Sequence, residues 1–303
     1  MNRSIMIFAA VSAALCAGSA QAQVRIVSVY EGMASYAEAM AADSTPDRDA
    51  LWREKVIDPY WELCAEGSQY LDYGPSLTTP VADIEGLKAA AHALRASSVE
   101  ATVRAAIEKA SSILPGPATT VCILAADPEW TYLRDLHGVG GFTAGAGKIW
   151  LTILPEGDWT DWLTYGIAHE YHHSVWMAAP RELSDMADYL VFEGQADSFA
   201  RLVDPQRQAP WTNALVAPQE RAAWQLMERH IGATDAETMR ALMFGGVDDV
   251  PRWAGYTIGF RMVQAFLGAH PELTVSQWTA IPTSEFIGRA FDDPEHFPRA
   301  PLP

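Results

Sequence analysis

The sequence predicts an α+β protein that is mainly helical, with a small β-sheet beside one central helix. Long stretches carry apolar residues at helical spacing, most clearly residues 84–114 and 252–267. Two short runs, residues 119–126 and 148–154, have the length and the β-branched composition of strands. An apolar segment around residues 159–177 has the length of one buried helix and follows the second strand directly.

The length of 303 residues suits one large domain or two closely joined ones. We divide the chain into a signal peptide (residues 1–22), a helical N-terminal region (23–118), a domain that carries the central helix (119–290) and a flexible tail (291–303). The tail is proline-rich, as poorly ordered termini often are.

The first 22 residues have the three parts of a secretory signal peptide. Arg3 supplies the positive charge, residues 5–15 form the apolar core, and a small-residue cleavage site ends at Ala22. The apolar core is too short to span a membrane, which takes about 20 residues. Cys16 suggests a lipoprotein instead, but Leu15 stands where a small residue is expected. We therefore expect cleavage after Ala22 and a periplasmic or secreted protein.

The chain is strongly acidic, with a formal net charge of −17. This charge argues against nucleic acid and against an anionic membrane surface as partners. No later stretch is long and apolar enough to span a membrane. Cys64 and Cys122 remain after the signal peptide, and the sequence leaves one disulfide and two buried thiols equally open.

Residues 23–118 carry mostly helical patterns, including a mixed apolar stretch at 50–63 and a helix break near residues 96–98. Prolines at 115 and 117 end this region. The glycine-rich residues 137–147 predict a turn that leads into the strand at 148–154. They match neither a P-loop nor a dinucleotide-binding pattern.

The central helix contains an HExxH motif formed by His169, Glu170 and His173. Four residues make about one helical turn, so both imidazoles project from one face. This geometry suits two nitrogen ligands of one tetrahedral Zn²⁺, with Glu170 placed to accept a proton from a metal-bound water. Capping residues at 158–161 begin the helix and Pro180 ends it. The alternative is a core helix with surface histidines.

The next predicted helix, residues 181–203, offers a third ligand. Glu193 and Asp197 lie four residues apart on one face, and Gly194 allows a close helix approach. We expect Glu193 to bind zinc and Asp197 to accept the second ring N–H of a zinc histidine. A solvated acidic face is the alternative, but Glu193 follows an apolar run in which an unpaired carboxylate is costly.

HEYHH followed by EGQAD resembles the glutamate-zincin metallopeptidases of the thermolysin-like clan (peptidase MA). Within that clan it is most similar to bacterial predicted zinc proteases with HEYHH and EGxAD motifs. The resemblance covers residues 120–270 and is strongest over 165–200. It implies a zincin-like domain over 119–290, with His169, His173 and Glu193 as ligands and Glu170 as the base. It also implies that the strand at 148–154 is an edge strand above the metal, to which an extended peptide adds.

Past a proline-rich loop at 204–218, helices are predicted at 219–231, 235–244 and 252–267. Tyr256 is a catalytic candidate, because a phenol there could stabilise an oxyanion; a core aromatic is the equally open alternative. Arg261 either neutralises a substrate carboxylate or pairs with a surface acid.

Together these features predict an exported zinc metallopeptidase that binds one Zn²⁺ per chain and acts on a peptide or protein substrate. Two alternatives remain: a zinc hydrolase of a non-peptide amide such as a cell-wall fragment, and a non-catalytic binding protein on a zincin scaffold. The intact Glu170 argues against the second, which has no use for a base. No oligomeric state is predicted.

Overall fold

The computed structural model describes residues 23–42, 47–69, 78–246 and 250–291. The predicted signal peptide and the tail after Phe291 lie outside these residues. The strands are β1 (Val24–Ser28), β2 (Thr119–Ala125), β3 (Val139–Gly145) and β4 (Lys148–Ile153). The helices are α1 (Val29–Ala42), α2 (Arg48–Trp52), η1 (Arg53–Ile57), α3 (Trp61–Cys64), α5 (Ile84–Ala96), α6 (Val99–Ile113), α7 (Tyr132–Asp135), α8 (Trp159–Trp176), α9 (Met186–Val203), η3 (Pro210–Asn213), α10 (Ala217–Glu228), α11 (Ala236–Phe244), α12 (Ala254–Ala269), α13 (Val275–Thr279) and α14 (Thr283–Phe291). The fold is α+β and mainly helical, as predicted.

The four strands form one mixed sheet in the order β1-β2-β4-β3. β1, β2 and β4 are parallel, and β3 runs antiparallel to β4. A two-residue turn at residues 146–147 joins β3 to β4, and Gly147 takes a positive φ of 69° there. The strand directly before the HExxH helix is therefore internal. The expectation that this strand forms the edge is wrong, because β3 pairs along its outer side.

β1 and β3 are strands that the sequence patterns did not predict. β1 lies in the region expected to be mainly helical, and it leads straight into α1. β3 occupies most of the glycine-rich segment, whose composition disfavours strands. Pairing with β2 and β4 respectively determines both. β1 thereby joins the N-terminal region to the sheet of the following segment.

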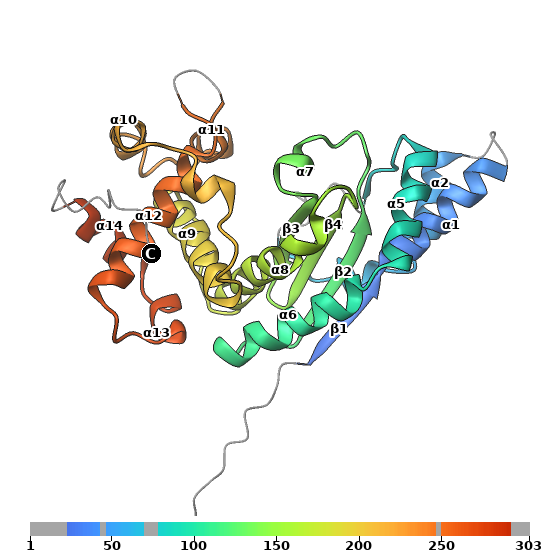
Figure 1. Ribbon diagram of the computed structural model, residues 1–303, viewed down its shortest axis with the longest axis horizontal. Helices are drawn as coiled ribbons and strands as arrows, with labels where there is room; N and C mark the ends of the chain where they lie inside the picture. Colours follow the sequence, from blue (N-terminus) through green and yellow to red (C-terminus); the bar gives the residue numbers. More distant parts are fainter. Residues whose placement is uncertain (1–22, 43–46, 70–77, 247–249, 292–303) are drawn as a thin grey trace, which may run out of the picture.

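Helices cover both faces of the sheet (Figure 1). α6 and α8 pack against one face, and α1 and α5 contact the other. The predicted helix break is present, since α5 ends at Ala96 and α6 begins at Val99. A disulfide between Cys64 and Cys122 links α3 to β2, with Cα atoms 6.0 Å apart. The structure thus answers the question that the two cysteines left open.

α8 begins where the sequence predicted, after Asp158. Asp158 does not cap the helix through its side chain. Its carboxylate instead contacts His137 Nδ1 at 3.1 Å and accepts a hydrogen bond from Trp162 Nε1 at 3.2 Å. The carboxylate therefore connects the start of the helix to the loop that precedes β3.

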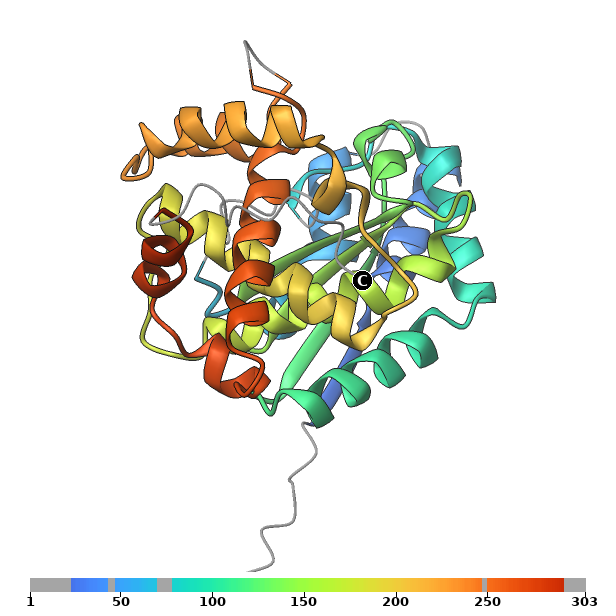
Figure 2. The same ribbon diagram turned by 60° about the vertical axis from the view of Figure 1, so that its left-hand side comes forward.

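The C-terminal helices form a second hydrophobic core, centred on α9 and α12. Figure 2 shows α12 (red-orange) crossing α9 (yellow). A Cβ atom on Gly194 would lie 2.2 Å from the Gly259 carbonyl oxygen, so the two helices meet backbone to backbone. α9 begins at Met186, five residues later than predicted, because Asp185 caps it by accepting from Asp188 N at 3.0 Å. Within the described residues, no helix has the length and apolar character needed to cross a membrane.

Candidate metal centre

α8 brings two histidines of the HExxH motif to one point. His169 and His173 are one helical turn apart and both are buried. Their Nε2 atoms lie 2.9 Å from each other. Two imidazole nitrogens this close share either a proton or a metal ion, since two lone pairs or two N–H groups at this distance repel. The HExxH spacing therefore produces a convergent pair of nitrogen donors.

α9 adds a carboxylate to the pair. Glu193 Oε2 lies 3.1 Å from His169 Nε2 and 3.5 Å from His173 Nε2, and Glu193 is buried. Ligands about 2.0–2.1 Å from a tetrahedral zinc are separated from one another by about 3.4 Å. The three observed separations are close to this value. His169, His173 and Glu193 thus form a buried cluster that could bind a metal ion.

The electrostatics of the cluster match this assignment. Burial opposes the charged form of His169, but the carboxylates of Asp197 and Glu193 outweigh it and raise the pKa of His169 well above its usual value. Burial likewise opposes the ionised form of Glu193, but the neighbouring His173 and His169 lower its pKa to about 2. In the absence of a metal, protons therefore hold the cluster together, and a divalent cation would replace them.

Asp197, one turn after Glu193 on α9, holds the other side of His169. Its Oδ1 lies 3.1 Å from His169 Nδ1, and its carboxylate is fully buried. Tyr165 donates its hydroxyl to Oδ1 at 3.0 Å, and Trp211 Nε1 donates to both oxygens at 3.0 Å. Neither donor is among the site residues predicted from the sequence. The sequence position of Tyr165 could have indicated this contact, since Tyr165 precedes His169 by one helical turn on α8. Nothing in the sequence indicates Trp211.

Phe192 orients the second histidine by packing rather than by a hydrogen bond. Its ring stacks on His173 with centroids 3.7 Å apart and an interplanar angle of 13°. Among the described residues, His173 Nδ1 has no hydrogen-bond partner. The two histidines are therefore held differently, one by a carboxylate and one by an aromatic face.

Glu170 lies beside the cluster but outside the group of converging ligand atoms. Thr143 of β3 donates its hydroxyl toward Glu170 Oε2 at 2.7 Å and toward the Glu170 carbonyl oxygen at 2.8 Å. Both residues are buried. The carboxylate is thus held by the edge strand and not by the two histidines.

His172 lies between the two histidines in sequence, but its side chain points away from the cluster. Its Nε2 lies 3.2 Å from Thr279 Oγ1, and its ring stacks on Trp278 at 5.4 Å. Burial, followed by the charges of His173 and His169, lowers the pKa of His172 well below its usual value. His172 is therefore a neutral core residue.

Tyr256 of α12 lies near the cluster. Burial, then the Glu193 carboxylate and Tyr189, raise the pKa of the Tyr256 hydroxyl well above its usual value, so the phenol stays protonated. Arg261, also on α12, is buried in an ion pair with Glu220 at 3.3 Å and donates to Asn213 at 2.7 Å. Arg261 therefore pairs with a buried carboxylate of the protein, whereas the sequence suggested a substrate carboxylate or a surface acid.

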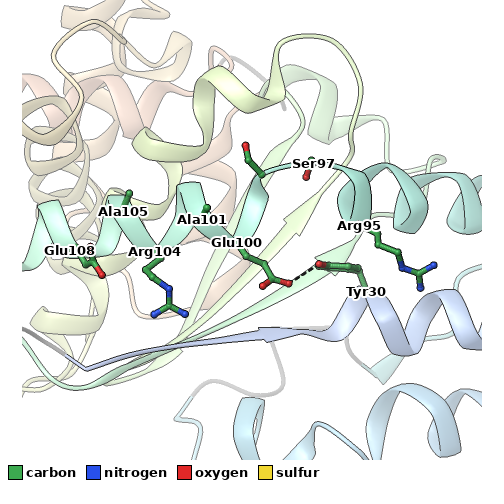
Figure 3. Close-up of a pocket in the computed structure, with 9 residues that line it drawn as sticks. Tyr30, Arg95, Ser97, Glu100, Ala101, Arg104, Ala105 and Glu108 are labelled. Atoms are coloured by element: carbon green, nitrogen blue, oxygen red, sulfur yellow. Dashed lines mark hydrogen bonds between the residues drawn. The ribbon is translucent and has the colours of Figure 1, made fainter.

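A cavity of about 590 Å³ lies away from the cluster, along α5, α6 and the start of α1 (Figure 3). Glu100 accepts a hydrogen bond from Tyr30 at 2.8 Å inside it, and Arg104 donates to the Val24 carbonyl at 3.1 Å. These groups bond to the protein itself, and none of the residues that line the cavity belongs to α8 or α9. We assign it no role in the chemistry of the cluster.

Comparisons with known proteins agree with the metal cluster. The uncharacterized protein YjfC of Bacillus subtilis (strain 168) is 28% identical over 177 residues, which cover 54% of this chain and 58% of that protein. The chain thus matches a little over half of this relative's length. No solved structure gives a significant match. The family model described as "Predicted Zn-dependent protease (DUF2268)" matches residues 99–288, which include β2 to β4 and the entire cluster. Because this match covers more than half of the chain, the protein belongs to this family of predicted Zn-dependent proteases.

Proposed function

We propose that this protein is an exported zinc-dependent peptidase of the glutamate-zincin type, with one zinc ion per chain. His169, His173 and Glu193 hold the metal, Asp197 orients His169, and Glu170 is the general base. The observation that carries the proposal is the convergence of the three ligand atoms, with separations of 2.9, 3.1 and 3.5 Å, beside a carboxylate that stays outside the group.

In this proposal a zinc ion held by His169, His173 and Glu193 would supply Lewis-acid chemistry, favouring ionisation of water near neutral pH and polarisation of the scissile carbonyl. Glu170 takes a proton from the attacking water and passes it to the leaving amine. Its place on α8, one residue after His169 and bound to Thr143, supports this role. A protonated Tyr256 donates a hydrogen bond to the oxyanion that develops on the substrate.

We assign the peptide to the edge strand β3, next to Glu170. Leu154 N donates to the Gly138 carbonyl. In the antiparallel pair β3–β4, every second residue counted from Gly138 along β3 therefore directs its backbone N–H and C=O groups toward β4, and the residues between them direct these groups away from it. By that alternation, the backbone groups of Gly141 and Thr143 point away from β4, toward the side of β3 on which no other described strand pairs. Ala144, farther along, accepts from Gln69 N at 2.8 Å. An extended peptide would therefore add along the part of β3 before Ala144.

Export is supported by two independent features. The first 22 residues have the composition of a signal peptide that is cleaved after Ala22. The disulfide between Cys64 and Cys122 suits an oxidising compartment such as the periplasm or the extracellular space. Mass spectrometry of the exported protein should give Gln23 as its N-terminus, and an intact leader or a lipidated Cys16 would contradict this assignment.

The decisive experiment replaces Glu170 with Gln. The variant should keep close to one zinc per chain, since Glu170 lies outside the ligand group, while cleavage of a diverse peptide library should fall at least about 100-fold. Glu182→Gln, an exposed substitution in the loop between α8 and α9, is the matched control. A chelator should abolish cleavage by the wild-type protein.

The other outcomes separate the alternatives. Loss of zinc from Glu170→Gln would make Glu170 structural and refute the mechanism. Cleavage of a cell-wall amide but of no peptide would favour the non-peptide hydrolase. Full retention of the protein's biological function by a zinc-loaded Glu170→Gln variant would favour a binding protein on a zincin scaffold.

A further inference from the structure

We infer that two residues of the edge strand β3, Gly141 and Thr143, position the carboxylate of Glu170 for proton transfer. This inference rests on the proposed function, because it concerns the base of that reaction. Both are positioning residues, since they act through Glu170. Neither belongs to the HExxH or EGQAD motif.

Thr143 fixes one oxygen of the carboxylate. Its hydroxyl lies 2.7 Å from Glu170 Oε2, and both side chains are buried. A threonine has one hydroxyl proton, and the contact to Oε2 at 2.7 Å is shorter than the contact to the Glu170 carbonyl oxygen at 2.8 Å. Because Oε2 is occupied in this way, Oε1 is the oxygen left to receive a proton from water.

Gly141 makes room for that second oxygen. A Cβ atom at position 141 would lie 2.4 Å from Glu170 Oε1 and 2.3 Å from Glu170 Cγ. These contacts are far below van der Waals distance, and the clashing atoms belong to a movable side chain. An alanine there would therefore displace the Glu170 carboxylate and leave the backbone in place.

Strand geometry explains why these two residues act together. Positions 141 and 143 alternate with 142, so their side chains share the face of the sheet that α8 covers. The pairing register shifts directly after Thr143, which pairs with Ile149, whereas Gly145 pairs with Lys148. Such bulges often re-aim side chains next to active sites. Here the shift ends the regular alternation at Thr143.

The test compares two substitutions with matched controls in the zinc-loaded protein. Thr143→Val removes the hydroxyl at nearly constant shape, and Thr143→Ser keeps it. Thr152→Val makes the same change at a buried threonine of β4 that pairs with Gly140, on the opposite face of the sheet. For Gly141→Ala the control is Gly116→Ala, whose added Cβ would likewise clash with a side-chain end, at 2.4 Å from Val175 Cγ2.

We expect kcat to fall about 10- to 100-fold in Thr143→Val and in Gly141→Ala, with KM and zinc content nearly unchanged. Thr143→Ser should recover most of kcat, and both controls should stay within about 3-fold of wild type. In the Glu170→Gln background neither substitution should lower the residual rate further, because the group that they position is gone. Crystal structures should show the Glu170 carboxylate displaced in both variants.

Several results would overturn the inference. An unchanged kcat in folded Thr143→Val or Gly141→Ala would do so, as would an unmoved Glu170 carboxylate in their crystal structures. Additive losses in the Glu170→Gln background would assign both residues a general structural role. If Thr143→Val does not fold, Gly141→Ala decides the question. Failure of the proposed function is distinguishable, because the wild-type protein would then cleave no peptide or Glu170→Gln would cleave as fast as wild type.

Discussion

Replacing Asp197 with Asn tests how the metal centre is supported. The carboxylate is fully buried and accepts hydrogen bonds from Tyr165, His169 and Trp211. An amide that keeps its oxygen at the Oδ1 position retains Tyr165, His169 and one of the two bonds from Trp211. Its N–H group, however, points toward Trp211 Nε1 in place of the Oδ2 acceptor. The substitution therefore removes the negative charge beside His169 and creates a donor–donor contact.

The expected losses of metal affinity and of stability can each be given a magnitude. Removing a carboxylate that orients a metal histidine lowers metal affinity about 10- to 100-fold, or about 1.4 to 2.7 kcal/mol. The buried amide N–H group that Asp197→Asn introduces, which has no acceptor, should lower the unfolding free energy of the metal-free protein by about 1–3 kcal/mol. Competition with a fluorescent zinc chelator measures the first quantity, and urea unfolding of the metal-free protein measures the second.

Asp161→Asn is the control, because Asp161 forms an exposed ion pair with Arg207 at 3.0 Å on the same helix as His169. Such surface pairs contribute about 0–1 kcal/mol, so this variant should bind zinc as wild type does. An Asp197→Asn protein with wild-type zinc affinity would refute the assigned role. It would mean that Asp197 supports only the packing between α8 and α9.

Three further predictions follow. The carboxylates beside His169 raise its pKa in the folded protein. The charged ring therefore stabilises the metal-free fold fully below the pKa of about 6.5 that histidine has in the unfolded chain, and this stabilisation is lost as pH rises through the pKa of the folded state. Zinc affinity should therefore rise with pH up to the raised pKa, and calorimetry in buffers of different ionisation enthalpy should detect proton release; a pH-independent affinity would contradict this. Replacing Cys64 and Cys122 by Ser should lower the unfolding free energy by about 4 kcal/mol, the chain-entropy value for a separation of 58 residues, and a loss below about 1 kcal/mol in urea unfolding would count against it. Gly194→Ala should cost about 3 kcal/mol or more, because the added Cβ would lie 2.2 Å from a backbone oxygen of α12, whereas Gly268→Ala meets no atom within 4 Å and should be neutral or stabilising in thermal unfolding.

Much of the helical frame and the residues of the candidate metal cluster could be predicted from the sequence. The start of α8, the break between α5 and α6, and the strands β2 and β4 depend on local patterns: apolar spacing and β-branched runs. The end of α8 was predicted less well, since the helix ends at Trp176, before Pro180. The HExxH spacing is local too, since one helical turn brings His169 and His173 together. Glu193 was identified because a carboxylate inside an apolar helix calls for a buried partner.

The environment of the cluster depended on contacts between segments far apart in the chain. Trp211 reaches Asp197 from a short 3₁₀ helix, and Thr143 reaches Glu170 from a glycine-rich strand. Neither contact leaves a periodic or compositional signal, because a single hydrogen bond constrains only two residues. The strand order of the sheet likewise depends on contacts between distant segments. β3 has weak strand propensity and becomes the edge strand only through pairing with β4, so the position of the edge beside Glu170 follows from tertiary packing and not from any local pattern.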